Sequence, residues 1–316
     1  MDERTRTTPT HGSDINTQRL PWRLVRQSNK DRAMRSTCFM GGVKDKSVHT
    51  STSMKAVLHR SLCVAAAASV AMAAPNRIRL YVPSQPLVAG GQLALSDAQR
   101  HHLYSVMRQR EGGSVAVFNG VDGEWEAQID VLSKRACHLS IRTLLRPQPA
   151  VKRSTVLLFG VLKGARLPTL IEKAVELGAD ELQPVLTQHC AVRSLNVERL
   201  GAIAVEASEQ SGRLTVPCVR EPQPLQAVLD GWDALRPLCV CDERRLDDTP
   251  TLSARLADGS LDAGAGVLIG PEGGFSAEEF ETLETLPFVR PVSLGANILR
   301  AETAALAAMA IIGCGR

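Results

Sequence analysis

The sequence predicts two folded parts, a small β-rich barrel over residues 76–150 and an α/β domain over residues 151–316. Short runs of alternating or β-branched residues, separated by glycine turns, predict the barrel. From Thr155 onwards apolar strands alternate with amphipathic helices, a pattern typical of a parallel sheet covered by helices. The chain of 316 residues has room for about two domains, and its 44% hydrophobic content with 3% aromatic residues predicts aliphatic cores.

Residues 1–75 follow neither pattern, and we exclude them from the fold. They are rich in Arg, Ser and Thr, lack a sustained apolar period and end in an Ala-rich run. Three interpretations stay open. They are an organelle-targeting leader, in which Asp2, Glu3 and Asp14 are unusual, a signal-like segment that begins at Met54, and a start codon placed too early.

The charge is distributed unevenly along the chain. Lys and Arg outnumber Asp and Glu by 12 to 5 in residues 1–75 and by 11 to 6 in residues 76–153, whereas residues 154–316 carry 14 against 22. The middle segment therefore has a net charge of +5 and the C-terminal segment one of −8. Any polyanion should dock first on the middle segment, although ordinary surface variation explains the same numbers.

The eight cysteines include no Cys-x-x-Cys pair, and no histidine stands at zinc-ligand spacing from them. Cys239 and Cys241 lie in an apolar run, where alternation places both on one face of a strand. We interpret the cysteines as buried free thiols and expect no metal, which favours a reducing compartment. No apolar run reaches the length of a membrane span, so we expect no membrane partner.

Four strands separated by glycine turns are predicted in the first part, at Ile78–Val82, Val115–Phe118, Trp125–Val131 and Cys137–Leu144. One helical stretch from Ser96 to Arg108 lies between the first two strands, with Ser96 as its cap. A basic rim is predicted near its end, formed by His101, His102, Arg108 and Arg110. Phosphate contact or helix termination explains the two histidines better than metal binding, because adjacent helical residues point in different directions.

The second part begins with a buried strand, Thr155–Leu162, and an amphipathic helix, Arg166–Leu177, closed by Gly178 in the C′ position. The other predicted elements are a strand at Leu182–Leu186, a helix capped by Asn196 that runs to about Ser211, strands at Val216–Val219, Leu238–Cys241, Val267–Ile269 and Val292–Leu294, and a helix from about Glu302 to Ile312. This last helix is apolar on every face, so we expect it to be buried in its own domain or against a second copy.

The glycine-rich segment 270–276 is the clearest candidate for a ligand loop. It follows the strand Val267–Ile269 directly, and Ser276 with Glu279 has the spacing of a capping box. Glycines let a ligand approach main-chain groups, and ligands of α/β sheets bind at the carboxyl ends of strands. The segment lacks the Walker A and dinucleotide patterns. We therefore predict a nucleotide-like ligand that backbone groups hold without a phosphate cradle.

The C-terminal part carries two motifs, Gly270–Pro–Glu–Gly–Gly–Phe–Ser276 and the segment that runs from Leu294–Gly to Ile298–Leu–Arg–Ala–Glu–Thr–Ala304. Further motifs stand at Leu162–Arg166, Ile171–Gly178, Glu206–Arg213 and His101–Arg108. In this combination they resemble the RsmE family of 16S rRNA (uracil-N3)-methyltransferases, within the SPOUT superfamily. The resemblance runs from about Arg77 to Ile312.

The resemblance implies a PUA-like RNA-binding barrel, a trefoil-knotted SPOUT-type α/β domain with a parallel sheet, and a homodimer. It also implies methyl transfer from S-adenosylmethionine to N3 of a uridine in 16S rRNA, in the assembled small subunit. Two alternatives stay open, a non-catalytic ribosome- or RNA-binding protein and a 2′-O-ribose methyltransferase. The expected compartment is a bacterial-type cytoplasm, or a mitochondrion or plastid if residues 1–75 are a transit peptide.

The same resemblance suggests the site residues. The methyl donor is expected to lie against Leu268, Ile269, Gly270, Glu272, Gly273, Leu294, Gly295, Asn297, Ile298, Leu299 and Thr303. Arg300 is predicted to stabilise the developing uridine anion, with a structural pair to Glu302 or to a helix-start carboxylate as the alternative. Glu209 or Glu302 is the candidate base if the proton is not lost to water, although the helix dipole also explains Glu302. RNA contacts are expected from Arg79, His102, Arg108, Arg110, Lys163, Arg166 and Arg213. For the last three, a link between the motifs or a solvated side chain is the alternative.

Asn297 departs from the family pattern, because members commonly carry Arg at this position. Asn brings no charge, so a cationic role at this point is lost in this chain. We expect the loop to keep its geometry, since Asn tolerates the left-handed conformation of turns.

Overall fold

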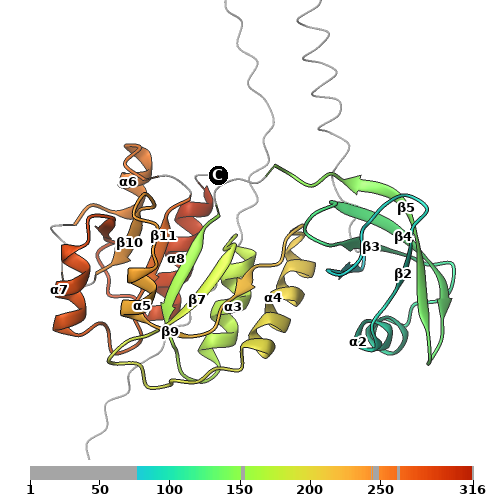
Figure 1. The fold of residues 1–316 in the computed structure, drawn as a ribbon, viewed down its shortest axis with the longest axis horizontal. Coiled ribbons are helices and arrows are strands. Elements are labelled where there is room, and N and C mark those ends of the chain that lie inside the picture. Colours follow the sequence, from blue (N-terminus) through green and yellow to red (C-terminus); the bar gives the residue numbers. More distant parts are fainter. Residues whose placement is uncertain (1–76, 151–153, 243, 245–248, 262–263, 315–316) are drawn as a thin grey trace, which may run out of the picture. The chain divides into compact units, whose positions relative to one another are not determined.

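The computed structural model describes residues 77–150, 154–242, 244, 249–261 and 264–314 (Figure 1). The three interpretations of residues 1–75 lie outside the described residues.

Five strands form the sheet of the N-terminal part: β1 (Arg79–Tyr81), β2 (Gln92–Ala94), β3 (Ser114–Phe118), β4 (Glu124–Leu132) and β5 (Cys137–Arg146). Their order is β1-β3-β4-β5-β2, with β1 parallel to β3 and the other pairs antiparallel. Within the described residues β1 and β2 do not pair with each other, so the predicted barrel is a half-barrel. Alternate residues such as Val115, Val117 and Ile129 fill its aliphatic core.

Two short helices stand where one was predicted, α2 (Asp97–His101) and the π-helix η1 (His102–Val106). The predicted cap is confirmed, since Ser96 accepts from the Gln99 amide in a capping box. Buried Leu103 anchors η1 to the half-barrel core, and Arg108 then adopts a left-handed φ of 51°. His102, Arg108 and Arg110 are exposed, so the predicted basic rim lies at the surface.

Seven parallel strands form the second sheet: β6 (Val156–Gly160), β7 (Glu181–Leu186), β8 (Cys218–Val219), β9 (Gln223–Pro224), β10 (Leu238–Cys241), β11 (Gly266–Ile269) and β12 (Val289–Val292). The order is β12-β10-β11-β6-β7-β8, with β9 also beside β7. The parallel sheet is as predicted, but the strand expected at Val292–Leu294 was placed too late. Pro291 interrupts the apolar pattern of β12, so the sequence did not show where this strand begins. The strand tolerates a proline because it lies at the edge of the sheet.

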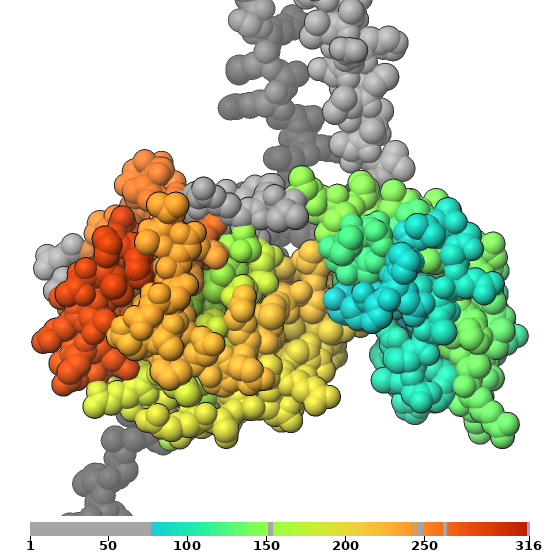
Figure 2. Space-filling view, viewed as in Figure 1, coloured from blue at the N-terminus to red at the C-terminus, as the bar shows by residue number. Residues whose placement is uncertain are grey.

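Six helices cover this sheet within the described residues: α3 (Arg166–Glu176), α4 (Val197–Ser211), α5 (Leu225–Asp230), α6 (Leu252–Ala257), α7 (Ala277–Thr285) and α8 (Ala301–Cys314). Strand residues alternate between two cores. Leu157 and Phe159 pack with α3, α4, α6 and α8, whereas Val156 and Leu158 pack with α5 and α7. The orange and red segments that include α5 and α7 show their outer surface in Figure 2.

The predicted helix ends are confirmed. Asn196 accepts from the Arg199 amide at the start of α4, and Gly178 follows α3 with a left-handed φ of 97°. Ser276 and Glu279 form the expected capping box at the start of α7. Sequence reasoning missed β2, β9, α5 and α6, which are all too short to show a clear period.

Helix α8 is buried on one side only. Ala304, Ala305, Ala308, Met309 and Ile312 are buried, while Leu306, Ala307 and Ala310 are half-buried and Thr303 is exposed. An apolar stripe of α8 is therefore left outside the domain core.

The free cysteines follow the prediction in part. Cys239 is buried and Cys241 half-buried, and both face the core that contains α3 and α8. Burial raises the pKa of the Cys239 thiol to about 12, so it is an inert apolar group. Cys218 and Cys314 are exposed, so the expectation of buried thiols was wrong for these two.

Candidate functional site

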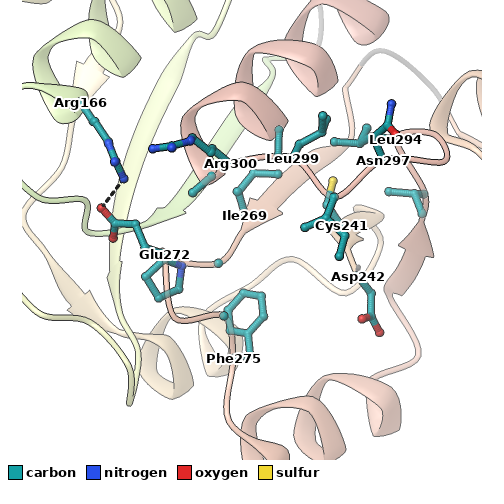
Figure 3. A pocket seen from close by; sticks show the side chains of 17 residues that line it. Arg166, Cys241, Asp242, Ile269, Glu272, Phe275, Leu294, Asn297, Leu299 and Arg300 are labelled. Atoms are coloured by element: carbon teal, nitrogen blue, oxygen red, sulfur yellow. Dashed lines mark hydrogen bonds and ion pairs between the residues drawn. The ribbon is translucent and has the colours of Figure 1, made fainter. Parts of the chain in front are cut away.

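A pocket of about 370 Å³ lies where β10, β11 and β12 end (Figure 3). Strands β10 and β12 contribute Cys241 and Val292, and the glycine loop after β11 and the first turn of α8 close the pocket. This is the position that the carboxyl-end rule for α/β sheets predicts. The volume falls in the range of small-ligand sites.

The glycine loop fits against the sheet because β6 ends in a glycine, Gly160, which has no side chain. A Cβ at Gly160 would lie 2.4 Å from the Pro271 nitrogen, so only glycine allows this approach. The Gly274 amide donates to the Pro271 carbonyl at 2.9 Å and closes the turn, with Gly274 at a φ of 67°. The capping box of Ser276 then starts α7, so the loop is held at both ends.

The second loop, between β12 and α8, forms the opposite wall of the pocket. Gly295 adopts a φ of 121°, and its amide donates to the Ser293 hydroxyl at 3.2 Å. Asn297 has a negative φ, so tolerance of the left-handed region by Asn is not what preserves this loop. That explanation was wrong, because Gly295 carries the unusual conformation.

The pocket brings together many of the predicted donor residues: Ile269, Gly270, Glu272, Leu294, Asn297, Ile298 and Leu299 line it, as does Arg300. Leu268 is fully buried in the core beneath the pocket, and Thr303 is exposed on α8. Gly273 faces a neighbouring cavity, and Gly295 shapes the loop without lining the pocket.

Sequence reasoning missed Asp242, which follows β10 directly. Its carboxylate is 6% exposed and accepts hydrogen bonds from the Arg244 amide, Nε and Nη2 at 2.9 to 3.0 Å. Arg244 also lies 3.2 Å from the ring centre of Phe280, and its hydrogen bond to Asp242 raises the pKa of the guanidinium. The rule that ligands bind at the carboxyl ends of strands, applied to Leu238–Cys241, would have found Asp242. The same rule accounts for Cys241, whereas Phe275 and Ala304 reach the pocket only through tertiary packing.

One edge of the pocket carries a small charge cluster. The Arg166 guanidinium lies 3.5 Å from Glu272 Oε1 and 3.6 Å from Glu302 Oε1. The other oxygen of Glu302, Oε2, is buried and has no hydrogen-bond partner among the described residues. Figure 3 shows Arg300 close to this cluster, and it is exposed with no ion pair to any described residue. Glu302 therefore pairs with Arg166, and its predicted structural pair with Arg300 does not form.

Glu209 lies outside both cavities, on α4. Its carboxylate accepts from the Tyr81 amide at 2.8 Å. Burial raises the pKa of Glu209, and the hydrogen bond from Tyr81 offsets only part of this effect. Glu209 is thus held by a hydrogen bond to the backbone of β1, and the structure does not bring it to the pocket.

Arg79 and Arg213 make their contacts inside the protein. Arg79 donates to the carbonyls of Ser208, Glu209 and Arg213 at 2.6 to 2.8 Å and pairs with Glu124. Arg213 donates to the Val175 carbonyl and pairs with Asp180 at 2.8 Å. These contacts favour structural roles for both side chains over the predicted RNA contacts. Lys163 and Arg166, by contrast, line a cavity next to the pocket.

Comparisons with known proteins agree with this fold. A family model described as an RNA methyltransferase domain matches residues 150–313, and one described as an RNA methyltransferase PUA domain matches residues 95–142. The chain is 33% identical over 233 residues to the ribosomal RNA small subunit methyltransferase E of Rickettsia conorii, covering 73% of this chain and 93% of that protein. The Synechocystis protein of the same name is 34% identical over 239 residues, covering 74% and 76%.

Two solved structures are similar as well. The ribosomal RNA small subunit methyltransferase E of Neisseria gonorrhoeae, bound to S-adenosyl methionine, has a TM-score of 0.64 and 29% identity and covers 76% of this chain and 98% of that chain. A Legionella pneumophila protein in complex with bound cofactor SAM has a TM-score of 0.66 and 27% identity, over the same shares.

The half-barrel and the pocketed parallel sheet together define an RNA methyltransferase domain preceded by a PUA domain. The two curated relatives carry the same name and share 33% and 34% identity with this chain over about three quarters of its length. The chain belongs to the ribosomal RNA small subunit methyltransferase E family.

Proposed function

We propose that this protein transfers a methyl group from S-adenosylmethionine to N3 of a specific uridine in the 16S rRNA of the small ribosomal subunit. The observation that carries the proposal is the pocket between the two glycine-containing loops at the ends of β10, β11 and β12. Support comes from relatives named ribosomal RNA small subunit methyltransferase E and from a similar structure bound to S-adenosyl methionine.

The lining of the pocket suits this donor. Ile269, Leu294 and Leu299 provide apolar contact, and Gly270 exposes main-chain groups that can recognise an adenine edge. The described residues of the pocket form no cradle of cations for a phosphate, in keeping with a ligand that carries a sulfonium and an amino-acid tail. When bound, S-adenosylmethionine supplies an electrophilic methyl group.

Much of the catalysis should come from positioning, because the reacting nitrogen must approach the methyl carbon in line. Arg300 lines the pocket without an ion-pair partner among the described residues, so its charge is free to stabilise a uridine that has lost its N3 proton. Glu302 remains the candidate base, although it lines neither cavity: it follows the pocket residue Ala301, Arg166 holds one of its oxygens and the other is buried.

A homodimer and a trefoil knot in the α/β domain complete the proposal. The apolar stripe of α8 around Leu306 and Ala310 offers a surface for a second copy, and the resemblance implies the knot. No described helix has the length and apolar character needed to cross a membrane. We place the protein where small ribosomal subunits assemble, and the mass of the mature N-terminus distinguishes cytoplasm from organelle.

The decisive test is incubation of the protein with labelled S-adenosylmethionine and small ribosomal subunits, followed by mass spectrometry of the modified nucleotide. Label at N3 of a single 16S uridine supports the proposal. Label on ribose would indicate a 2′-O-methyltransferase instead. A folded protein that shows no heat of donor binding in calorimetry would favour the non-catalytic RNA-binding alternative.

A further inference from the structure

A second cavity, of about 640 Å³, adjoins the donor pocket. Its walls come from the segment after β6, the loop after β7 and the glycine loop. Arg166 and Glu272 line both cavities, so an occupant of the second lies next to the occupant of the first. The volume falls within the range of small-ligand sites.

Among the described residues, Lys163 is the cation of the second cavity that no carboxylate pairs with, because Arg166 is held by Glu272 and Glu302. Lys163, Arg166 and His189 line the cavity together with one acid, Glu272. The Glu272 carboxylate already accepts from the Lys163 amide at 3.2 Å and lies 3.5 Å from Arg166. Residues 154–316 carry a net charge of −8, so Lys163 is a local cation that favours contact with an anionic group of a ligand.

His189 has a defined tautomer. Its Nδ1 lies 2.9 Å from the Gly273 carbonyl oxygen, which can only accept, so Nδ1 must carry the proton. In the neutral ring Nε2 is then a hydrogen-bond acceptor. Nε2 makes no hydrogen bond to any part of the chain that the structure describes, so it is available to a ligand.

The loop that carries His189 is held in place before any ligand binds. The Gln188 amide donates to Glu279 Oε1 at 2.8 Å, which ties this loop to the capping box of α7. A Cβ at Gly273 would lie 2.9 Å from the His189 Cβ, so the close approach of the two loops requires glycine. Such preorganisation is typical of binding sites.

We infer that the second cavity receives the target uridine nucleotide, extruded from its stack, and that His189 Nε2 accepts a hydrogen bond from its ribose 2′-hydroxyl. Enzymes that modify a base must take it out of the stack. An internal uridine has two hydrogen-bond donors, N3–H and the 2′-hydroxyl. N3 must face the donor pocket to be methylated, which leaves the 2′-hydroxyl for Nε2, while Lys163 contacts the phosphate. This inference rests on the proposed function.

The first experiment pairs His189→Ala with small subunits that contain either uridine or 2′-deoxyuridine at the target position. Loss of one hydrogen bond should lower kcat/KM about tenfold for wild type on the deoxy substrate and for H189A on the normal one. The two losses should not add. Gln188→Ala is the control, because this exposed neighbour lines neither cavity. The inference would be overturned if the deoxy substrate lowered kcat/KM equally in wild type and in H189A. Full activity of H189A on the normal substrate would overturn it as well.

The second experiment fills the cavity with Ala191→Trp. Ala191 lines the second cavity but not the donor pocket, so donor affinity measured by calorimetry should stay within about twofold while methyl transfer falls at least tenfold. The inference would be wrong if A191W kept the wild-type rate of methyl transfer and normal donor affinity. It would also be wrong if a folded A191W lost its affinity for the donor. If wild type itself transfers no methyl group, the proposed function fails and the inference fails with it.

Discussion

At the scale of single residues, the site depends on which charges are paired. Arg166 is held by Glu272 and Glu302, and Asp242 by Arg244, whereas Arg300 has no ion pair among the described residues. A cation that is already paired with a carboxylate contributes little to the stabilisation of a developing anion. Arg300 is thus the pocket cation best suited to respond to substrate.

Replacing Arg300 with Ala should lower kcat for rRNA methylation by roughly 100-fold, because a cation beside the uridine oxygens acts mainly in the transition state. Donor affinity, measured by calorimetry, should change little. Arg300→Lys should recover part of the rate, since it keeps the charge but not the fork of donors. An R300A enzyme with unchanged kcat would remove this residue from the mechanism.

Glu124 is the most buried ion-pair partner in the half-barrel. It is 6% exposed and pairs with Arg79 at 2.5 Å and Arg146 at 2.6 Å. Burial by itself raises the pKa of this carboxyl, but the hydrogen bonds from Arg146 and Arg79 outweigh burial and lower it. Because the folded-state pKa is lowered, the carboxylate stabilises the fold above its unfolded pKa and loses this effect as pH falls through the folded value.

Glu124→Gln should therefore reduce the free energy of unfolding by about 2–3 kcal/mol at pH 7, and less at pH 3.5. Urea unfolding at the two pH values measures the difference. The control is Glu126→Gln, whose pair with Arg77 is about one-third exposed and should cost under about 1 kcal/mol. If E124Q lost the same free energy of unfolding at both pH values, the result would contradict the pKa argument.

At the scale of elements, the pocket depends on how closely the glycine loop approaches β6. The contact is possible because Gly160 ends the strand without a Cβ. Strand and loop are 110 residues apart in sequence, at Gly160 and Gly270, so a local pattern does not reveal this requirement.

Gly160→Ala should displace the glycine loop, since its Cβ would lie 2.4 Å from the Pro271 nitrogen. We expect a stability loss of about 1–3 kcal/mol and at least tenfold weaker donor binding, by calorimetry and thermal unfolding. Gly201→Ala is the matched control, because this position on α4 has open space and helical geometry, so stability should hold or rise. Normal donor affinity in G160A would show that the loop does not shape the donor site.

The comparison between sequence and structure is clearest for these elements. Caps and periodicity depend on residues a few positions apart, so Ser96, Asn196 and Ser276 were correctly assigned from sequence. β12 was misplaced because Pro291 breaks the apolar pattern where the edge position tolerates it. The short helices α5 and α6 carry too few residues to show a period.

At the scale of the whole molecule, one helix of the α/β domain, α8, keeps a half-buried apolar side that the domain core does not cover. Thr303, Leu306, Ala307 and Ala310 lie on the side of the helix that the domain core does not cover. A helix with apolar residues on all sides favours a second partner for the open side.

The protein should therefore have twice the mass of one chain in light scattering coupled to size exclusion. Ala310→Glu should weaken the dimer, because burying an unpaired carboxylate costs several kcal/mol. Ala202→Glu, on an exposed position of α4, serves as the control and should leave the mass unchanged. A wild-type monomer would contradict the dimer, and a dimer that A310E leaves intact would place the interface elsewhere.

The sequence by itself determined the two-part fold class, most helix caps, the glycine loop and the family. These features depend on local periodicity, on turn residues and on short motifs, all of which are visible within a few positions. Only the tertiary structure decided that Phe275 and Ala304 join the pocket, that Arg79, Arg213 and Glu209 make internal contacts, and that His189 faces a second cavity. The reason is that the order of parallel strands, with β11 between β6 and β10, brings distant strand ends together. Long-range pairing sets that order, and no local pattern encodes it.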